Sequence, residues 1–225
     1  MLSKITASLI CMDLSDIKTD IDTLLDNGIN SLHADFMDNT FVPRLGISPE
    51  LVQWIRKRYG KNVNIDSHLM VQNPYDCIDV IAPFSDWVFF HYEAVPDPVR
   101  ILQKIDKMSI ANKGIAYNLG TPFENELIET GLVDGVMFMG ISPGVLGTLS
   151  WPNIIKNRIS DFKHFSDETK IFVDGGVSFK SLGYLGADKL VCGSSTLFKI
   201  DEETKGLTRP EMIKHNIRRI EEAMQ

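Results

Sequence analysis

Short apolar runs alternate with amphipathic segments along the whole chain. The runs are rich in β-branched residues, which is typical of strands, and the segments between them carry apolar residues at helical spacing. Strands and helices that alternate in this way predict a parallel sheet covered by helices. The predicted strands are Lys4–Ile10, Asn30–Phe36, Val63–Leu69, Asp86–Tyr92, Asn112–Asn118, Gly135–Gly140, Lys170–Gly175 and Asp188–Ser194.

The clearest predicted helix lies within Asp13–Gly28. Either Asp13 or Ser15 would cap its start, and the glycine would end it. A second helix within Ser48–Gly60 follows the same pattern, with a serine cap and a proline at the first helical position. The apolar residues of the first helix share one face: Ile17, Ile21, Leu24 and Leu25.

Eight strand–helix units in 225 residues predict an α/β fold, a single (β/α)8 TIM barrel with a closed parallel sheet of eight strands. No repeat, low-complexity tract or Pro/Gly/Ser-rich linker divides the sequence, so we expect one domain over residues 1–225. A doubly wound open sheet is the structural alternative, because it also alternates strands with helices.

Composition and charge exclude several classes of partner. The formal net charge is -7 and no basic run offsets it, which disfavours a nucleic acid held by phosphate contacts. No apolar stretch approaches the roughly 20 residues of a membrane helix, and we expect no signal peptide. Cys11, Cys77 and Cys192 are odd in number and far apart, so we expect a reducing compartment, most simply the cytoplasm.

Polar residues gather at the carboxyl ends of the predicted strands, where (β/α)8 barrels hold their active sites. His33 and Asp35 are two residues apart, so both side chains leave the same face of a strand, where burial without partners is costly. Asp66 and His68 repeat this spacing on the third strand, and Asp174 ends the seventh. Further polar residues at strand ends are His91, Glu93, Asn118 and Ser194.

Taken singly, these residues have structural explanations. A buried histidine is usually a hydrogen-bonded core residue, and an aspartate before two glycines can simply form a turn. Taken together, two histidines and two aspartates at one level of a barrel form a set of nitrogen and oxygen ligands for a metal ion. Glycines at the ends of strands six to eight leave backbone N–H groups free to face an anion. The combination indicates a small phosphorylated substrate.

Several segments match one family in unchanged order along the chain. They are "ASLICMD", "LHADFMDNTFVP", "DSHLMVQNP", "FHYEA", "SPG", "VDGGVS" and "GADKLVCGSSTLF". On these segments the chain resembles the ribulose-phosphate 3-epimerase family, metal-dependent (β/α)8 enzymes that invert carbon 3 of ketose phosphates. The stretch "SLICMD" is more similar to the allulose-6-phosphate 3-epimerase branch than to the usual pentulose branch.

The resemblance implies a role for each matching residue. The family's metal ligands fall on His33, Asp35, His68 and Asp174, which would hold one divalent ion (zinc, manganese, iron or cobalt). Its two acid/base carboxylates fall on Asp35 and Asp174. The expected partner is a small-molecule sugar phosphate, with no nucleic acid and no membrane, and we expect a homo-oligomer. The implied substrate-binding residues are Ser8, Met37, Met70, Met139, Gly144, Gly147, Gly175, Gly176, Gly193 and Ser194.

The loop after the sixth strand departs from the family pattern. Val145 replaces an aromatic residue, Leu146 replaces a glycine and Thr148 replaces a glutamine, while Asn39 and Thr40 replace the usual Gly-His after the second strand. These changes leave the metal set intact and touch the distal end of the substrate. We therefore expect a ketose phosphate other than ribulose 5-phosphate to be preferred.

The leading hypothesis is an epimerase that acts through an enediolate, of the type that interconverts ribulose 5-phosphate and xylulose 5-phosphate. Inversion needs one proton-handling group on each face of the planar intermediate, and Asp35 and Asp174 would approach it from different sides. A decarboxylase or lyase on a related barrel is a second hypothesis, but its Asp-x-Lys-x-x-Asp set is absent from the strand ends. A non-catalytic barrel that binds a sugar phosphate is a third.

Overall fold

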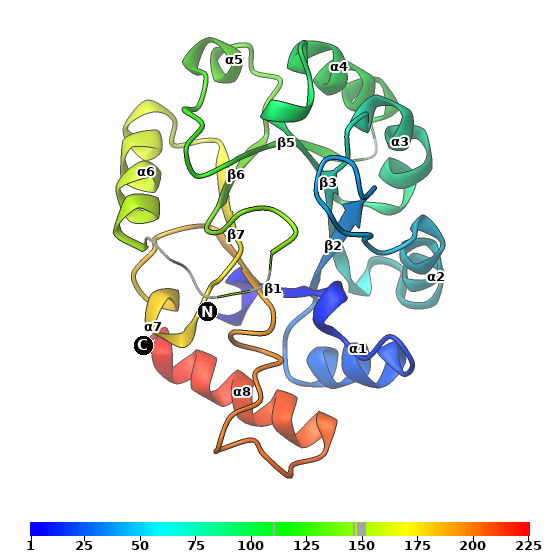
Figure 1. Cartoon of the computed structure of the whole chain (residues 1–225), viewed down its shortest axis with the longest axis vertical. Helices are drawn as coiled ribbons and strands as arrows, with labels where there is room; N and C mark the ends of the chain where they lie inside the picture. Colours follow the sequence, from blue (N-terminus) through cyan, green and yellow to red (C-terminus); the bar gives the residue numbers. More distant parts are fainter. Residues whose placement is uncertain (110, 146, 148–151) are drawn as a thin grey trace.

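The strands of the described chain form a closed parallel barrel surrounded by helices (Figure 1). The computed structural model describes residues 1–109, 111–145, 147 and 152–225. Each strand pairs in parallel with the next along the chain, and the last pairs with the first. The strands are Ile5–Ser8 (β1), Ser31–Met37 (β2), Asn64–Met70 (β3), Trp87–His91 (β4), Asn112–Tyr117 (β5), Gly135–Met139 (β6), Lys170–Asp174 (β7) and Lys189–Cys192 (β8).

Closure of the sheet confirms the predicted barrel and excludes the open alternative. In the β1–β8 register, Ile5 lies opposite Leu190 and Ala7 lies opposite Cys192. The first and last strands are shorter than the predicted runs, because the chain enters a 3-10 helix after Ser8 and a turn region after β8.

Helices follow the strands and cover the outside of the barrel (Figure 1). The α7 segment has only four residues, so little helix separates β7 from β8. The helices are Ile17–Asp26 (α1), Pro49–Tyr59 (α2), Pro74–Ile81 (α3), Pro98–Met108 (α4), Asn125–Glu129 (α5), Pro152–Phe165 (α6), Phe179–Leu182 (α7) and Arg209–Ala223 (α8).

The start of α1 corrects one sequence prediction. The N-cap is Asp16, whose side chain accepts a hydrogen bond from the Thr19 N–H, and neither Asp13 nor Ser15 caps the helix. Asp13 instead accepts hydrogen bonds from the backbone N–H and the hydroxyl of Ser15. These bonds form a local turn that precedes the helix. Ser48 and Gly60 flank α2 as predicted.

Alternate residues of the strands serve two separate cores. One set packs outward against the helices, and the other fills the barrel. Inside, Phe89 and Phe172 pack with their ring centroids 4.7 Å apart, and Trp87 stacks on Phe89. A Cβ at Gly114 would lie 2.2 Å from the Phe89 ring, so this position accepts only glycine. This aromatic layer fills part of the barrel interior.

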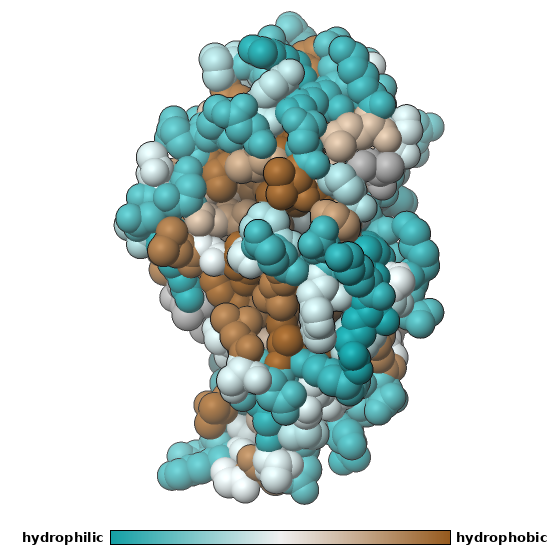
Figure 2. Space-filling model, turned by 90° about the vertical axis from the view of Figure 1, so that its right-hand side faces the viewer, coloured by the Kyte–Doolittle hydropathy of each residue, from teal (hydrophilic) through white to brown (hydrophobic). Residues whose placement is uncertain are grey.

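The outer surface is mixed in character. Figure 2 shows the side that carries α2 and α3, where apolar side chains gather over the middle and hydrophilic ones surround them. Trp54 of α2, Val80 of α3 and Leu45 before α2 are exposed. None of the helices that the structure describes is both long enough and apolar enough to cross a membrane.

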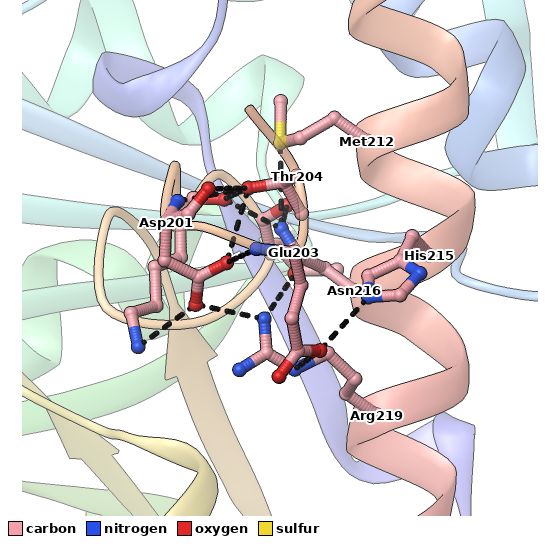
Figure 3. Close-up of polar contacts among 9 residues, drawn as sticks. Asp201, Glu203, Thr204, Met212, His215, Asn216 and Arg219 are labelled. Atoms are coloured by element: carbon pink, nitrogen blue, oxygen red, sulfur yellow. Dashed lines mark hydrogen bonds and ion pairs between the residues drawn. The ribbon is translucent and has the colours of Figure 1, made fainter. Parts of the chain in front are cut away.

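A polar network fastens α8 to the segment that follows β8 (Figure 3). Asp201 accepts a hydrogen bond of 2.9 Å from Arg219 of α8 and forms an ion pair with Lys199. One turn earlier on the helix, His215 lies 3.2 Å from Glu203. The network holds the last helix beside the loop that leads from β8, close to the rim where the polar residues gather.

Candidate active site

A pocket opens at the carboxyl ends of the strands. All of the site residues that the sequence predicted line it except His33 and His68, and these two histidines are fully buried behind its wall. The predicted residues in the lining are Ser8, Asp35, Met37, Met70, Met139, Gly144, Gly147, Asp174, Gly175, Gly176, Gly193 and Ser194.

Two aspartates and two histidines converge at the base of this pocket. His68 Nδ1 lies 3.4 Å from Asp35 Oδ1 and 3.4 Å from Asp174 Oδ2. His33 Nε2 lies 3.3 Å from Asp35 Oδ1 and 3.9 Å from Asp174 Oδ2. One ligand atom from each of the four residues lies within 4.8 Å of the other three. The β2–β3 register sets Asp35 beside His68, and Asp174 approaches from β7.

The spacing of these atoms fits a divalent cation. Two ligand atoms that are each about 2.1 Å from a tetrahedral ion lie roughly 3.4 Å apart, which matches the three shorter distances, while the fourth, between His33 and Asp174, is 3.9 Å. Both ring nitrogens of His33, and Nδ1 of His68, are buried without a hydrogen-bond partner in the described part of the chain. Buried polar atoms normally have partners, so these nitrogens indicate a ligand. Two imidazoles with two carboxylates suit zinc, manganese, iron or cobalt.

The charges of this cluster strongly change its proton affinities. Burial lowers the pKa of His33, but the carboxylates, Asp35 first among them, outweigh it and raise the pKa to about 9. Burial raises the pKa of Asp35, yet His33 and His68 bring it well below its usual range. The pKa of His68 is raised, because the adjacent carboxylates of Asp174 and Asp35 outweigh its burial. Positive charge is therefore favoured beside these carboxylates, which is the position that a divalent cation would take.

Neighbouring side chains orient the cluster from both sides. The Ser8 hydroxyl donates a hydrogen bond of 3.3 Å to Asp35 Oδ2, which leaves Oδ1 to face the histidines. Asp66, two residues before His68, stays outside the cluster and accepts a hydrogen bond from Thr6. Burial raises the pKa of Asp66 to about 6. The two-residue spacing on β3 therefore could not tell which residue, Asp66 or His68, belongs to the cluster.

Apolar side chains form the other walls. Met37 and Met70 pack together with Val42, and Met139 belongs to the cluster inside the barrel with Phe172. All three methionines are buried. Thioethers carry no exchangeable proton, so this wall adds no proton donor to the pocket.

Comparison with known proteins identifies the relatives of this chain. The model of the "Ribulose-phosphate 3 epimerase family" matches residues 4–198. The chain belongs to the ribulose-phosphate 3-epimerase family. A ribulose-phosphate 3-epimerase of Methanocaldococcus jannaschii is 30% identical over 208 residues, which cover 89% of this chain and 87% of that protein. The ribulose-phosphate 3-epimerase of Escherichia coli K12 is 32% identical over 200 residues, 85% of this chain and 87% of that protein.

Membership of the ribulose-phosphate 3-epimerase family makes this chain an epimerase, an enzyme of carbohydrate metabolism. The fold also matches more distant barrels. The 3-hexulose-6-phosphate synthase of Salmonella typhimurium superposes with a TM-score of 0.68 at 15% identity, with 98% of each chain covered. At that identity, the likeness concerns the fold alone.

Two of the glycines that the ribulose-phosphate 3-epimerase resemblance singled out have little room for a side chain. Gly175 has a φ of +93°, and a Cβ there would lie 2.6 Å from the Ile141 side chain. A Cβ at Gly193 would lie 2.9 Å from Cys11 Sγ. Both glycines line the pocket, and a side chain at either position would force its neighbour to shift.

The loop that departs from the family pattern is described in part. Val145 lines the pocket and is exposed, while Leu146 and Thr148 lie outside the described residues. Arg44, which was not predicted from the sequence, also lines the pocket and donates a hydrogen bond of 3.4 Å to the Gly144 carbonyl. Its place depends on the path of the loop after β2, and the only signal in the sequence is that it follows Phe-Val-Pro directly.

Proposed function

We propose that this protein is a metal-dependent epimerase that inverts carbon 3 of a ketose phosphate, of the type that interconverts ribulose 5-phosphate and xylulose 5-phosphate. The observation that carries the proposal is the convergence of Asp35 and Asp174 on His33 and His68 at the base of a pocket with a glycine-rich rim. The relatives named ribulose-phosphate 3-epimerase support the substrate class.

The proposed cofactor is one divalent ion (zinc, manganese, iron or cobalt) held by His33, Asp35, His68 and Asp174. When bound, such an ion supplies Lewis-acid stabilisation of negative charge that develops on the substrate oxygens next to carbon 3. The unpartnered ring nitrogens of His33, the unpartnered Nδ1 of His68 and the close carboxylates support this choice over a purely structural cluster.

The two aspartates would carry the protons. One carboxylate removes the proton from carbon 3, and the electron pair of that C–H bond passes into an enediolate of the substrate. The other aspartate, protonated at that moment, gives its proton to the opposite face of carbon 3, which forms the inverted C–H bond. Asp35 on β2 and Asp174 on β7 are suited to this division because β1 and β8 separate them in the barrel. Return of the substrate along the same path exchanges their roles.

Backbone donors on the rim would bind the phosphate. Gly175 and Gly176 follow β7 and both have positive φ values, while Gly193 and Ser194 follow β8. All four line the pocket next to Asp174. Their amides would fix one end of the substrate while the aspartates act on carbon 3, and Met37, Met70 and Met139 would exclude water.

An allulose-6-phosphate 3-epimerase, or another epimerase of altered specificity, is the second candidate. Val145 in the pocket lining, where the family usually has an aromatic residue, supports it because the smaller side chain leaves more room at the far end of the substrate. We propose that ribulose 5-phosphate is a poorer substrate here than a ketose phosphate of different size.

One experiment separates these candidates. Purified protein is mixed in D2O with ribulose 5-phosphate or allulose 6-phosphate, and the carbon 3 proton is followed by NMR together with formation of the epimer. Loss of that proton with appearance of the epimer is expected, at a higher kcat/KM for the hexulose phosphate under the second candidate. Absence of both exchange and epimer with either substrate, in protein loaded with each of the four metals, would exclude the proposed reaction.

We propose a cytoplasmic location and a homo-oligomer. Three free cysteines support the first, because they are typical of a reducing compartment. The apolar side chains on the side that carries α2 and α3 support the second (Figure 2). Light scattering on the purified chain tests the oligomer, and a monomer at micromolar concentration would contradict it.

A further inference from the structure

A second histidine lies directly behind the His68 ring. His91 is the last residue of β4 and is fully buried, and its Nε2 lies 3.0 Å from His68 Nε2. The two rings are stacked with an interplanar angle of 25°. On its other side, His91 Nδ1 lies 3.1 Å from Glu93 Oε2. A continuous line of contacts thus runs from Glu93 through His91 to the imidazole that faces Asp35 and Asp174.

The direction of each hydrogen bond follows from the end of this line. A carboxylate can only accept, so His91 Nδ1 carries the proton that it donates to Glu93. A neutral His91 then has a bare Nε2, which accepts from His68 Nε2–H. When His68 is neutral, its second nitrogen, Nδ1, has a free lone pair, and this is the atom that points at the two aspartates.

Two further observations support these protonation states. The other oxygen of Glu93, Oε1, accepts a hydrogen bond of 2.8 Å from the Asn118 N–H. Burial raises the pKa of Glu93, but this bond and the bond from His91 help to bring the pKa down to about 2, so the carboxylate is ionised.

We propose that His91 and Glu93 are positioning residues that hold His68 in the tautomer whose Nδ1 lone pair is available to a metal ion. Neither residue lines the pocket, so we assign neither a contact with the substrate. The inference rests on the metal site proposed above. It adds that His68 must be held in one tautomer for the four ligands to bind the ion. A ligand histidine needs its second nitrogen engaged as a donor, and here the acceptor is another histidine backed by a carboxylate.

Metal affinity gives the first test. His91→Phe keeps a ring in the stack but removes the acceptor, and we expect it to weaken binding of zinc or cobalt by about 10–100-fold in a chelator competition. His91→Gln retains a side-chain oxygen that can accept from His68, so it should recover much of that loss. The matched control is His215→Phe on α8, which breaks a partly exposed histidine–glutamate pair far along the chain and should leave the affinity unchanged. Folded His91→Phe with wild-type affinity would overturn the proposal.

Histidine tautomers give a second test that does not need a bound metal. In protein labelled with 15N at histidine, His91 should carry its proton on Nδ1 with Nε2 bare at neutral pH, both with chelator and with zinc. Free imidazole side chains favour the opposite tautomer, so the result is diagnostic. A proton on His91 Nε2 would overturn the inference whether or not the protein binds a cation. Wild-type protein that binds no divalent cation would instead contradict the metal-dependent function proposed above.

Discussion

Asp35 and Asp174 come from strands on opposite sides of the β1–β8 seam, yet one oxygen of each lies 3.4 Å from the same nitrogen of His68. Two carboxylates this close would repel each other unless positive charge lay between them. The raised pKa values of His33 and His68 show how strongly the pair attracts such charge.

Removal of metal should abolish the activity. If His33, Asp35, His68 and Asp174 form one site, purified protein should contain close to one divalent ion per chain by elemental analysis. Treatment with a chelator should remove epimerisation, and zinc, manganese, iron or cobalt should restore it, because this ligand set does not discriminate strongly among them. Full activity in protein shown to be free of metal would contradict the site.

Replacement of either aspartate should separate proton exchange from inversion. Asp35→Asn and Asp174→Asn should each lower epimerisation on the order of 10²–10⁴-fold, because one face of carbon 3 loses its proton carrier. Either variant could still exchange the carbon 3 proton with solvent through the remaining carboxylate, which NMR in D2O detects. Asp79→Asn, an exposed carboxylate on α3, is the control and should epimerise normally. Two aspartate variants with near wild-type rates would exclude the two-carboxylate scheme.

Gly175→Ala should weaken binding of the phosphate. The new methyl group would lie 2.6 Å from Ile141 and force the backbone at φ +93° to move. The N–H groups after β7 would then no longer point toward the proposed phosphate position. A lost hydrogen bond to a charged group is worth about 1.5–3 kcal/mol, so KM should rise about tenfold or more with less change in kcat. Gly186→Ala, also at positive φ but away from the pocket lining, is the control for backbone strain and should lower stability alone. Equal KM values in the two variants would contradict the assignment.

The Asp201–Arg219 pair should make stability depend on pH (Figure 3). Burial raises the pKa of Asp201, but Arg219 and Lys199 outweigh it and bring the pKa well below its usual range. A carboxylate whose folded pKa is lowered stabilises the fold above its unfolded pKa of about 3.9, and this contribution is lost as the pH falls further. Asp201→Asn should therefore lower the free energy of unfolding by about 1 kcal/mol at pH 7 and by less near pH 3. Urea denaturation measures both, with Glu202→Gln as a control; a pH-independent difference would contradict the assignment.

The barrel could be predicted because its signals are local. Each strand and helix is marked by its own periodicity, and closure follows from the number of units, so residues at strand ends fall on one rim without knowledge of side-chain contacts. The cap of α1 was predicted wrongly because Asp13, Ser15 and Asp16 are equivalent as cap types, and a competing turn at Asp13 decides among them. A prediction from residue spacing alone does not include the competition between this turn and the helix cap.

Residues whose role depends on orientation could not be predicted. His91 is recognisable in the sequence as a polar residue at a strand end, but its contact with His68 depends on two ring orientations across β3 and β4. Arg44 enters the pocket because the chain turns back after β2, where Asp38 and Leu45 form an isolated antiparallel β-bridge. Neither arrangement leaves a pattern along the chain.

The pairing of β1 with β8 has a consequence for synthesis of the protein on the ribosome. Ser8 and Asp35 are made early and Asp174 and Gly193 late, so a nascent chain has no complete site until the eighth strand has emerged. Until then β1 and β7 each present an unpaired edge, which invites association with other chains. Prematurely terminated products should therefore be both inactive and prone to aggregate. The chain becomes active only when β8 has paired with β1.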